Sequence, residues 1–177
     1  MTAPKANMLH IIEGPVGSGK TTFARRLGQT LKTPALVLDD WMVRLFRADK
    51  PEQGLWAWYA ERKQRCQGQI LETARGLLET GHDAIIEVGL LKKDARLALY
   101  ERLDETPFSY RVYVLDAPIE ERWARVQKRN AEQGETFAMD VSEDVFKRAS
   151  DLWEPPCPKE CDDHDVRFLT QTETGFD

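Results

Sequence analysis

The sequence has 177 residues, 41% of them hydrophobic and 31% charged, which is enough chain for one domain with a sizeable core. The formal net charge of -5 argues against an obligatory DNA or RNA partner, because proteins that track phosphates usually carry a basic surface. The N-terminal segment has no apolar run of the length that a membrane span or signal peptide needs. We therefore expect a single domain over residues 1–177 that acts in the cytoplasm as a monomer or homodimer.

Five short apolar stretches, most of them with β-branched residues, predict the strands of a buried parallel sheet: Met8–Ile12, Ala35–Leu38, Ala84–Val88, Tyr110–Leu115 and Val166–Leu169. The segments between them have helical character: Phe23–Leu31, Trp56–Glu79, Lys93–Leu103, Pro118–Ala131 and Ser142–Trp153. This alternation predicts an α/β domain with helices on both faces of the sheet. Ligands of such sheets bind beyond the carboxyl ends of the strands, so we expect the active face in the loops that follow the first four strands.

The first of these loops has the pattern of a phosphate-binding loop. It satisfies G-x-x-x-x-G-K-[ST] and is followed by a second threonine: Gly14, Pro15, Val16, Gly17, Ser18, Gly19, Lys20, Thr21 and Thr22. Glycines let the backbone N–H groups approach phosphate oxygens, and the helix that begins near Gly19 adds its positive dipole end. We expect Lys20 to reach the β- and γ-phosphates of a nucleotide and the Thr21 hydroxyl to ligate Mg²⁺.

Two carboxylates follow the second predicted strand, in Leu36-Val37-Leu38-Asp39-Asp40-Trp41. Phosphoryl transfer to an alcohol needs a carboxylate that orients the attacking hydroxyl and accepts its proton. Asp39 or Asp40 suits this role, since this strand end lies close to the phosphate-binding loop. The alternative is that one of them caps the next helix. The two roles are compatible if Asp40 caps the next helix and Asp39 is the general base.

Two further acids end predicted strands. Glu87 lies in an apolar stretch, where a purely structural glutamate is uncommon, so we expect it to hold Mg²⁺-bound water or a substrate hydroxyl. Asp116 precedes Ala117-Pro118, which favours a helix cap. No strand ends in an adjacent Asp-Glu pair, which many ATPases use to activate water, so the pattern favours transfer over hydrolysis.

The predicted helix after the fourth strand carries three arginines, Arg122, Arg125 and Arg129, at helical spacing. One interpretation is a solvated face paired with Glu120 and Glu121. We favour the other, a lid over roughly residues 118–140 that closes on the nucleotide, because an arginine at the migrating phosphoryl group strongly favours transfer and the segment 131–140 contains a glycine hinge.

Near the C-terminus, Cys157, Cys161 and His164 are spaced in a way that suggests a metal motif. No fourth soft ligand is evident and the linking residues are turn-like, so we expect an irregular polar loop there.

These motifs resemble those of the P-loop kinase-like proteins of the AAA_33 or zeta-toxin-like group, to which chloramphenicol phosphotransferase and phage polynucleotide kinase are related. The resemblance implies a P-loop NTPase three-layer sandwich, with a five-stranded parallel sheet and a helical lid. It also implies that Asp39 is the general base, that Arg125 and Arg129 are the lid arginines, and that Trp153–Pro156 lies near the adenine. In polynucleotide kinase an arginine follows the acid pair sooner than Arg44 does here.

The acceptor is expected between the second strand and the long helix. Aromatic residues gather there and either stack on a substrate or form the core of a helical subdomain: Trp41, Phe46, Trp56, Trp58 and Tyr59. Basic residues in the same region suit an acceptor with a phosphate or carboxylate: Arg44, Arg47, Arg62, Lys63 and Arg65. We assign substrate contacts to Asp40, Trp41, Arg44 and Glu87.

Together these features predict an ATP- and Mg²⁺-dependent phosphotransferase that acts on an alcohol of a small molecule. Lys20, Asp39, Arg125 and Arg129 are its expected catalytic residues. The alternatives are a nucleotide-gated ATPase or switch with a partner protein, and a polynucleotide 5′-hydroxyl kinase, which the acidic charge disfavours.

Overall fold

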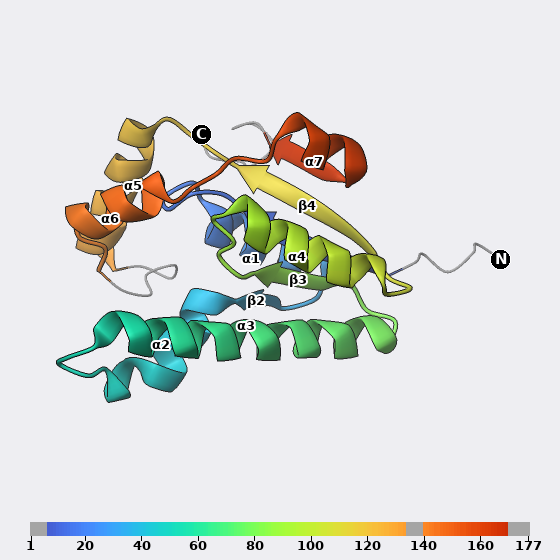
Figure 1. Ribbon diagram of the computed structural model, residues 1–177, viewed down its shortest axis with the longest axis horizontal. Helices are drawn as coiled ribbons and strands as arrows, with labels where there is room; N and C mark the ends of the chain where they lie inside the picture. The colour runs from blue at the N-terminus through green and yellow to red at the C-terminus, as the bar shows by residue number, and fades with distance from the viewer. Residues whose placement is uncertain (1–6, 134–139, 170–177) are drawn as a thin grey trace.

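The computed structural model describes residues 7–133 and 140–169. Its centre is a five-stranded, all-parallel sheet in the order β2-β3-β1-β4-β5 (Figure 1). The strands are β1 (Met8–Glu13), β2 (Ala35–Val37), β3 (Ala84–Glu87), β4 (Ser109–Leu115) and β5 (Val166–Leu169). The predicted α/β fold with a five-stranded parallel sheet is confirmed, and every predicted strand is present within one residue of its expected ends.

All five predicted helices are also present, as α1 (Lys20–Leu31), α3 (Leu55–Glu79), α4 (Lys93–Asp104), α5 (Ile119–Glu132) and α6 (Glu143–Asp151). Ser142 is the N-cap of α6, where its hydroxyl accepts a hydrogen bond from the backbone N–H of Val145. Three short elements were not predicted: α2 (Leu38–Phe46), the 3₁₀ turn η1 (Arg47–Asp49) and α7 (Pro158–Asp163).

The two helix caps considered for aspartates are wrong. Helix α2 follows β2 directly with Val37 as its N-cap, so both carboxylates of the acid pair lie inside its first turn. Pro118 is the N-cap of α5, and Asp116 instead accepts hydrogen bonds from the backbone N–H of Ala117 and from the indole of Trp153. The carboxylates of Asp39 and Asp40 nevertheless lie at the N-terminus of α2, where the helix dipole stabilises negative charge.

The irregular loop expected near the C-terminus is also wrong, because residues 158–163 form α7. Pro158 suits the first helical position, and the Glu160 carboxylate accepts a hydrogen bond from the backbone N–H of Cys157 at 3.2 Å. Within residues 7–133 and 140–169, no group of three or more His, Cys, Asp or Glu side chains is arranged to hold a metal ion.

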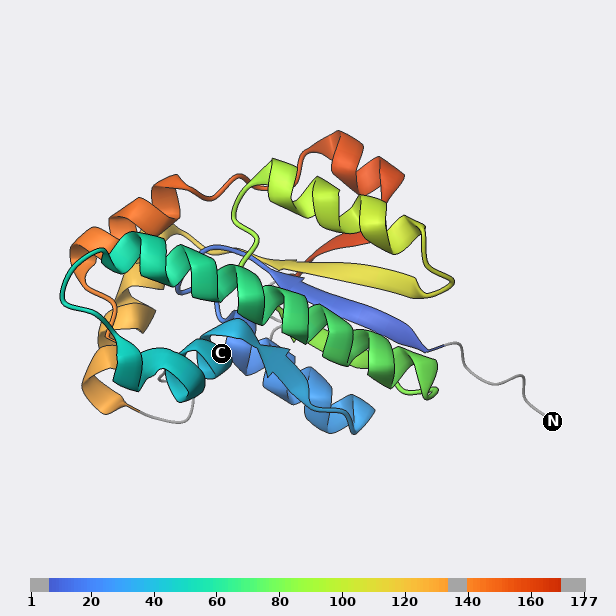
Figure 2. The ribbon, with the colours of Figure 1, turned by 60° about the horizontal axis from the view of Figure 1, so that its bottom comes forward.

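Helices cover both faces of the sheet (Figures 1 and 2). Alternating residues of β1, β3 and β4 pack on α3 and α4 on one face, through side chains such as Ile11, Ile86 and Val112. On the other face, Ile12 and Ile85 pack against α1. Helices α5 and α6 form a separate cluster beyond the strand ends. None of the described helices has the length and apolarity that a bilayer crossing requires.

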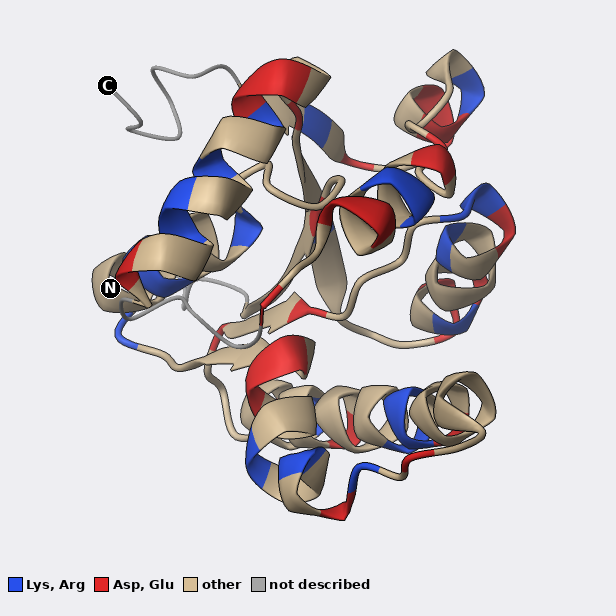
Figure 3. Ribbon diagram, turned by 90° about the vertical axis from the view of Figure 1, so that its left-hand side faces the viewer, with Lys and Arg blue, Asp and Glu red and all other residues tan. Residues whose placement is uncertain are grey.

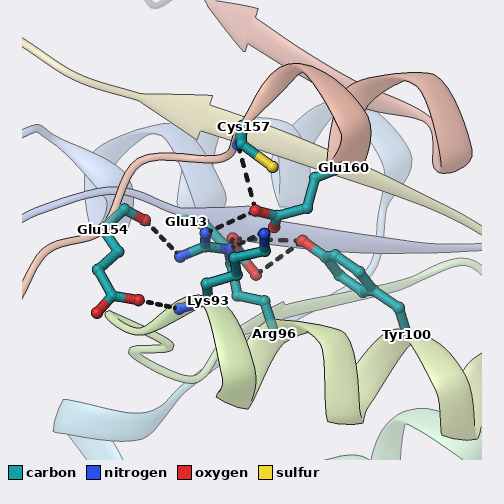
Figure 4. Close-up of polar contacts among 7 residues, drawn as sticks. All are labelled: Glu13, Lys93, Arg96, Tyr100, Glu154, Cys157 and Glu160. Atoms are coloured by element: carbon teal, nitrogen blue, oxygen red, sulfur yellow. Dashed lines mark hydrogen bonds and ion pairs between the residues drawn. The ribbon is translucent and has the colours of Figure 1, made fainter.

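One buried charge network ties this architecture together immediately before the phosphate-binding loop (Figure 4). Arg96 of α4 has no exposed surface, and its Nε and Nη2 donate to the two Glu160 carboxylate oxygens at 2.9 and 3.0 Å. Its Nη1 donates to the Glu154 carbonyl at 2.6 Å, and its Nε lies 3.6 Å from Glu13, the last residue of β1. The Tyr100 hydroxyl donates to Glu13 at 3.5 Å. The network therefore holds α4 and α7 against the end of β1.

The two acids of this network differ in charge. Burial raises the pKa of Glu13 to about 8, although the Arg96 guanidinium opposes this rise. Burial alone would also raise the pKa of Glu160, but its hydrogen bonds from Arg96 and the Cys157 backbone hold it below its usual value. At neutral pH Glu160 is therefore the ionised partner of Arg96, while Glu13 is largely protonated.

We expect the free energy of unfolding to fall as the pH rises, because Glu13 loses its proton. Its pKa is 4.5 ordinarily and about 8 in the folded chain, so the folded state keeps a proton that the unfolded state releases. This stabilisation is complete below the ordinary pKa and is lost as the pH rises through about 8. The charged and titratable groups that act on this carboxyl are Arg96, Tyr100, Glu160 and Lys20.

Urea unfolding between about pH 6 and pH 9 measures this effect. Glu13→Gln keeps the neutral form and should flatten the dependence, whereas Glu79→Gln, on an exposed side chain, should leave it unchanged. If the free energy of unfolding changes equally with pH in the wild type and in Glu13→Gln, Glu13 is not the cause of the pH dependence.

Candidate active site

A cleft of about 810 Å³ lies beyond the carboxyl ends of β1, β2 and β3. Figure 3 views this end of the molecule, where α2 begins with two acids and α5 carries basic residues. The lining comes from the phosphate-binding loop, α2, α3, the segment after β3, α5 and α6. It includes Val16, Gly17, Gly19, Lys20, Thr21, Thr22, Leu38, Asp39, Tyr59, Lys63, Glu87, Gly89, Leu91, Glu121, Arg125, Lys128, Arg129 and Val145. Sequence elements far apart thus meet at one site, as the sheet topology requires.

The phosphate-binding loop needs glycine where it meets neighbouring backbone. A Cβ at Gly14, where φ is +144°, would lie 2.0 Å from the Leu115 carbonyl oxygen at the end of β4. A Cβ at Gly17, where φ is +80°, would lie 2.5 Å from the Arg122 carbonyl oxygen of α5. Neither contact is tolerated, since a backbone carbonyl cannot swing away as a side chain does. Of the other loop positions, Pro15 and Ser18 are buried behind the cleft.

Gly17→Ala should therefore displace α5 from the loop. We expect nucleotide affinity to fall at least about tenfold, because the new methyl group strains the loop and pushes away the helix that carries the cleft arginines. Titration with a fluorescent ATP analogue measures this, with Gly68→Ala as the control, since a Cβ at Gly68 on α3 meets nothing within 4 Å. Wild-type affinity in Gly17→Ala would contradict the close-packing argument.

Lys20 is a partly desolvated cation at the cleft. Its Nζ donates to the Pro15 carbonyl at 2.8 Å. Burial lowers the pKa of Lys20, Glu87 and Asp39 raise it, and Arg129 and Arg122 lower it by less than the acids raise it. A polyanion against the loop would offset the cost of burying the ammonium and satisfy its remaining N–H groups. The electrostatics therefore suit a bound chain of phosphates.

Thr21 and Glu87 meet between the loop and the end of β3. The threonine Oγ1 donates a hydrogen bond to Glu87 Oε2 at 2.8 Å. Burial raises the pKa of Glu87 to about 7, against the lowering effect of Lys20. A hydroxyl and a buried carboxylate side by side are the oxygen donors that Mg²⁺ prefers when phosphate oxygens and water complete its octahedron. These two residues fit a magnesium ion beside the phosphates.

The structure separates the two acids of α2. Asp39 is exposed to the cleft and lines it, facing the same space as Lys20 and Glu87. Asp40 forms an ion pair with Arg25 of α1 at 2.9 Å and is not among the described lining residues. Of the pair, Asp39 is therefore the acid that a substrate in the cleft would meet.

The three arginines of α5 divide in a similar way. Arg125 and Arg129 line the cleft. Arg125 donates to Glu121 one turn earlier at 3.4 Å, whereas Arg129 Nε is buried with no hydrogen-bond partner in the part of the chain that the structure describes. Arg122 is buried and donates to the Val16 carbonyl at 3.0 Å, which fastens α5 to the phosphate-binding loop. Residues 134–139 of the expected hinge lie outside the described residues.

The other substrate residues expected from the sequence lie elsewhere. Trp41 packs against the core, and Arg44 is exposed on α2; neither is among the described lining residues of the cleft. Trp153 lies over the Arg96 guanidinium at 5.5 Å, and the Glu154 backbone N–H donates to the Leu91 carbonyl at 2.8 Å. Substrate contacts by Trp41 and Arg44, and an adenine contact by residues 153–156, stay predictions.

The sequence placed Tyr59 and Lys63 of α3 in the acceptor region but did not distinguish them from their neighbours as cleft residues. They are four residues apart, so they lie on the same helix face. Their helical spacing on a long amphipathic helix was available in the sequence. What the sequence does not show is which face of α3 meets the strand ends, since that depends on how the helix packs across β2 and β3.

Several proteins of known structure have a fold similar to that of this chain. No curated protein sequence gives a significant match. A solved structure from Chloroflexus aurantiacus has a TM-score of 0.72 and 18% identity, covering 99% of this chain and 91% of its own. A sugar kinase from Janibacter has a TM-score of 0.62 and 20% identity, covering 93% and 85%, and the Mycobacterium tuberculosis APS kinase has 0.62 and 18%, covering 94% and 90%. At these identities the likeness establishes the fold.

The family assignment rests on the sequence itself. The AAA_33 family, described as an AAA domain, matches residues 9–156, which include the phosphate-binding loop, Asp39, Glu87 and α5. Because this match covers most of the sequence and the sheet is five-stranded and parallel, the chain belongs to the AAA_33 family and has a P-loop NTPase-like α/β fold.

Proposed function

We propose that this protein transfers the γ-phosphate of ATP to a hydroxyl group of a small molecule, with Mg²⁺. The observation that carries the proposal is that Asp39 lines the same cleft as Lys20, Arg125 and Arg129. A phosphate-binding loop alone serves switches, motors and transferases equally. A carboxylate in the same cleft as the loop adds a group that can accept a proton from an alcohol.

The residues divide the reaction between them. The loop and Lys20 hold the β- and γ-phosphates, Thr21 and Glu87 hold Mg²⁺, and Arg125 and Arg129 face the group in transfer. Bound Mg²⁺ supplies positive charge to the phosphate oxygens. Asp39 accepts the proton of the acceptor hydroxyl as its oxygen forms a bond to the γ-phosphorus. The bond from that phosphorus to the β–γ bridging oxygen breaks, and ADP leaves.

Structural neighbours support a small acceptor. Besides the sugar kinase, a gluconokinase from Sinorhizobium meliloti has a TM-score of 0.56 and 14% identity, covering 93% of this chain and 83% of its own. The APS kinase was solved in complex with AMPPNP and APS. Proteins of this fold thus include kinases named for small molecules. The volume of the cleft, about 810 Å³, also suits such a ligand, since binding sites for small molecules usually measure a few hundred to about 1,000 Å³.

Transfer is tested by following the label of [γ-³²P]ATP. The purified protein is incubated with Mg²⁺, ATP and a panel of sugars, sugar acids, nucleosides and aminocyclitols, and products are separated from inorganic phosphate. The proposal expects label in an acceptor, with little phosphate released in its absence. Release of inorganic phosphate alone, unchanged by every acceptor, would favour the nucleotide-gated ATPase, and label on a 5′-hydroxyl oligonucleotide alone would favour the polynucleotide kinase.

A further inference from the structure

Part of the cleft lining comes from α2, α3 and the segment after β3. We call this part the acceptor wall, and it consists of Leu38, Asp39, Tyr59, Lys63, Gly89 and Leu91. Leu38 and Leu91 are its aliphatic members. Asp39 and Lys63 supply its charges, so a molecule bound there meets one carboxylate and one ammonium.

Lys63 is held with its ammonium at the cleft. Its side chain is half-buried, and Nζ donates to the Gly89 carbonyl at 3.1 Å. Gly89 follows β3 with φ +65°, a conformation that favours glycine, and a Cβ there would lie 3.8 Å from Nζ. This single hydrogen bond leaves two of the three N–H groups of the ammonium for another partner.

No carboxylate in the described part of the chain forms an ion pair with Lys63. Burial lowers the pKa of Lys63, and only the charge of Asp39 counters this effect. An ammonium withdrawn from water is costly without an opposite charge beside it. Asp39 is not free to neutralise it during the reaction, because the proposed role of Asp39 is to accept a proton. An anionic ligand group would supply the missing partner.

Tyr59 extends the same recognition surface. It lies one helical turn before Lys63 on α3, so both side chains lie on the same face of the helix and line the same cleft. Burial and the nearby charge of Asp39 raise the pKa of Tyr59 to about 12, which keeps its hydroxyl protonated and able to donate. A hydroxyl and an ammonium at this spacing offer two donors to the oxygens of one anionic group.

We propose that the phosphate acceptor is an alcohol that also carries an anionic group, a carboxylate or a phosphate, and that Lys63 binds this group while Asp39 faces the hydroxyl. This inference rests on the proposed phosphotransferase function and narrows its substrate class. Lys63 thereby favours anionic acceptors, whereas Asp39 accepts the hydroxyl proton of anionic and neutral acceptors alike.

The test compares acceptors in matched pairs. One set pairs sugar acids with the alditols of the same carbon skeleton, and a second pairs sugar phosphates with the parent sugars, so the two sets separate a carboxylate from a phosphate. ADP release and label transfer are measured for each compound at saturating ATP and Mg²⁺. We expect one anionic set to be used with kcat/KM about 10- to 100-fold above its neutral set, which is the effect of one charge-assisted hydrogen-bond pair.

Lys63→Met keeps the length of the side chain and removes the charge. It should raise KM for the preferred anionic acceptor by about tenfold or more, leave KM for ATP unchanged and lose the preference over the neutral partner. Lys63→Arg should recover part of the preference. Arg75→Met removes a charge from an exposed side chain further along α3 and should change neither constant, while thermal unfolding checks that all variants fold.

Several results would overturn the inference. If neutral alcohols are used as well as their anionic partners, the kinase function stands and the acceptor class is wrong. If Lys63→Met lowers kcat equally for anionic and neutral acceptors, Lys63 is a positioning residue for Asp39 instead. If no acceptor of any kind receives label although ATP binds, both the acceptor class and the phosphotransferase function fail.

Discussion

Asp39→Asn should lower phosphoryl transfer to the acceptor by about 10²- to 10⁴-fold while leaving ATP affinity nearly unchanged, because asparagine keeps the shape of the side chain but cannot take up a proton. The position supports this separation of effects. Asp39 lies in the first turn of α2, so it lines the cleft from a different element than the phosphate-binding loop. Single-turnover label transfer and titration with a non-hydrolysable ATP analogue measure the two quantities.

The neighbouring acid provides a matched comparison. Asp40→Asn makes the same chemical change one residue along, but this carboxylate is engaged by Arg25 at 2.9 Å. We expect a loss of transfer of at most about tenfold, since an ion pair of this partly exposed kind contributes little. An Asp39→Asn variant that transfers phosphate at the wild-type rate would show that the hydroxyl needs no base from α2, and equal losses in both variants would point to the stability of α2 itself.

The sequence was sufficient to predict the sheet and the tightly bent glycine-rich loop after β1. Short β-branched runs between charged residues predict parallel strands because both faces of such strands are buried, as at Ile11 and Ile12. The glycine-lysine pattern predicts a tightly bent loop because glycine favours positive φ, and φ is +144° at Gly14 and +80° at Gly17.

Elements without an apolar pattern were harder to predict. Helix α7 has six residues, most of them polar, and it depends on the capping by Glu160 and on the pairing of that residue with Arg96, 64 positions earlier. Helix α2 starts directly after β2 with no loop, so the acid pair was assigned to a strand end when it belongs to a helical turn. Neither feature has a periodicity that a single sequence reveals.

The acceptor wall shows the same limit at the site. Lys63 was one of several basic residues in its region, and no pattern in the sequence separates it from Arg62 or Arg65. In the fold, Lys63 faces the cleft, Arg62 lies over the Trp58 ring at 4.6 Å, and Arg65 is exposed with Glu61. Neighbours on a helix face different directions, so their roles are decided only once the packing of α3 is known.

The second large effect concerns stability. Arg96→Met should lower the free energy of unfolding by about 3–5 kcal/mol, because it leaves Glu13 and Glu160 buried without their shared cation. This guanidinium links the acid at the end of β1 to the acid of α7, and it also donates to the Glu154 carbonyl. Urea unfolding followed by circular dichroism near pH 7 measures the change. Arg75→Met removes the same group from an exposed pair with Glu79 and should leave the unfolding midpoint almost unmoved.

A second variant separates loss of packing from the cost of unpaired charge. If the penalty in Arg96→Met comes from the buried acid left ionised, then adding Glu160→Gln should recover a large part of it, because Glu160 is the member that carries the negative charge at neutral pH. If the penalty comes from lost contacts, the second change should destabilise further. Full additivity of the two substitutions would therefore contradict an electrostatic network at the end of β1, whereas strong non-additivity would show that the strand leading into the phosphate-binding loop is fixed by paired charges.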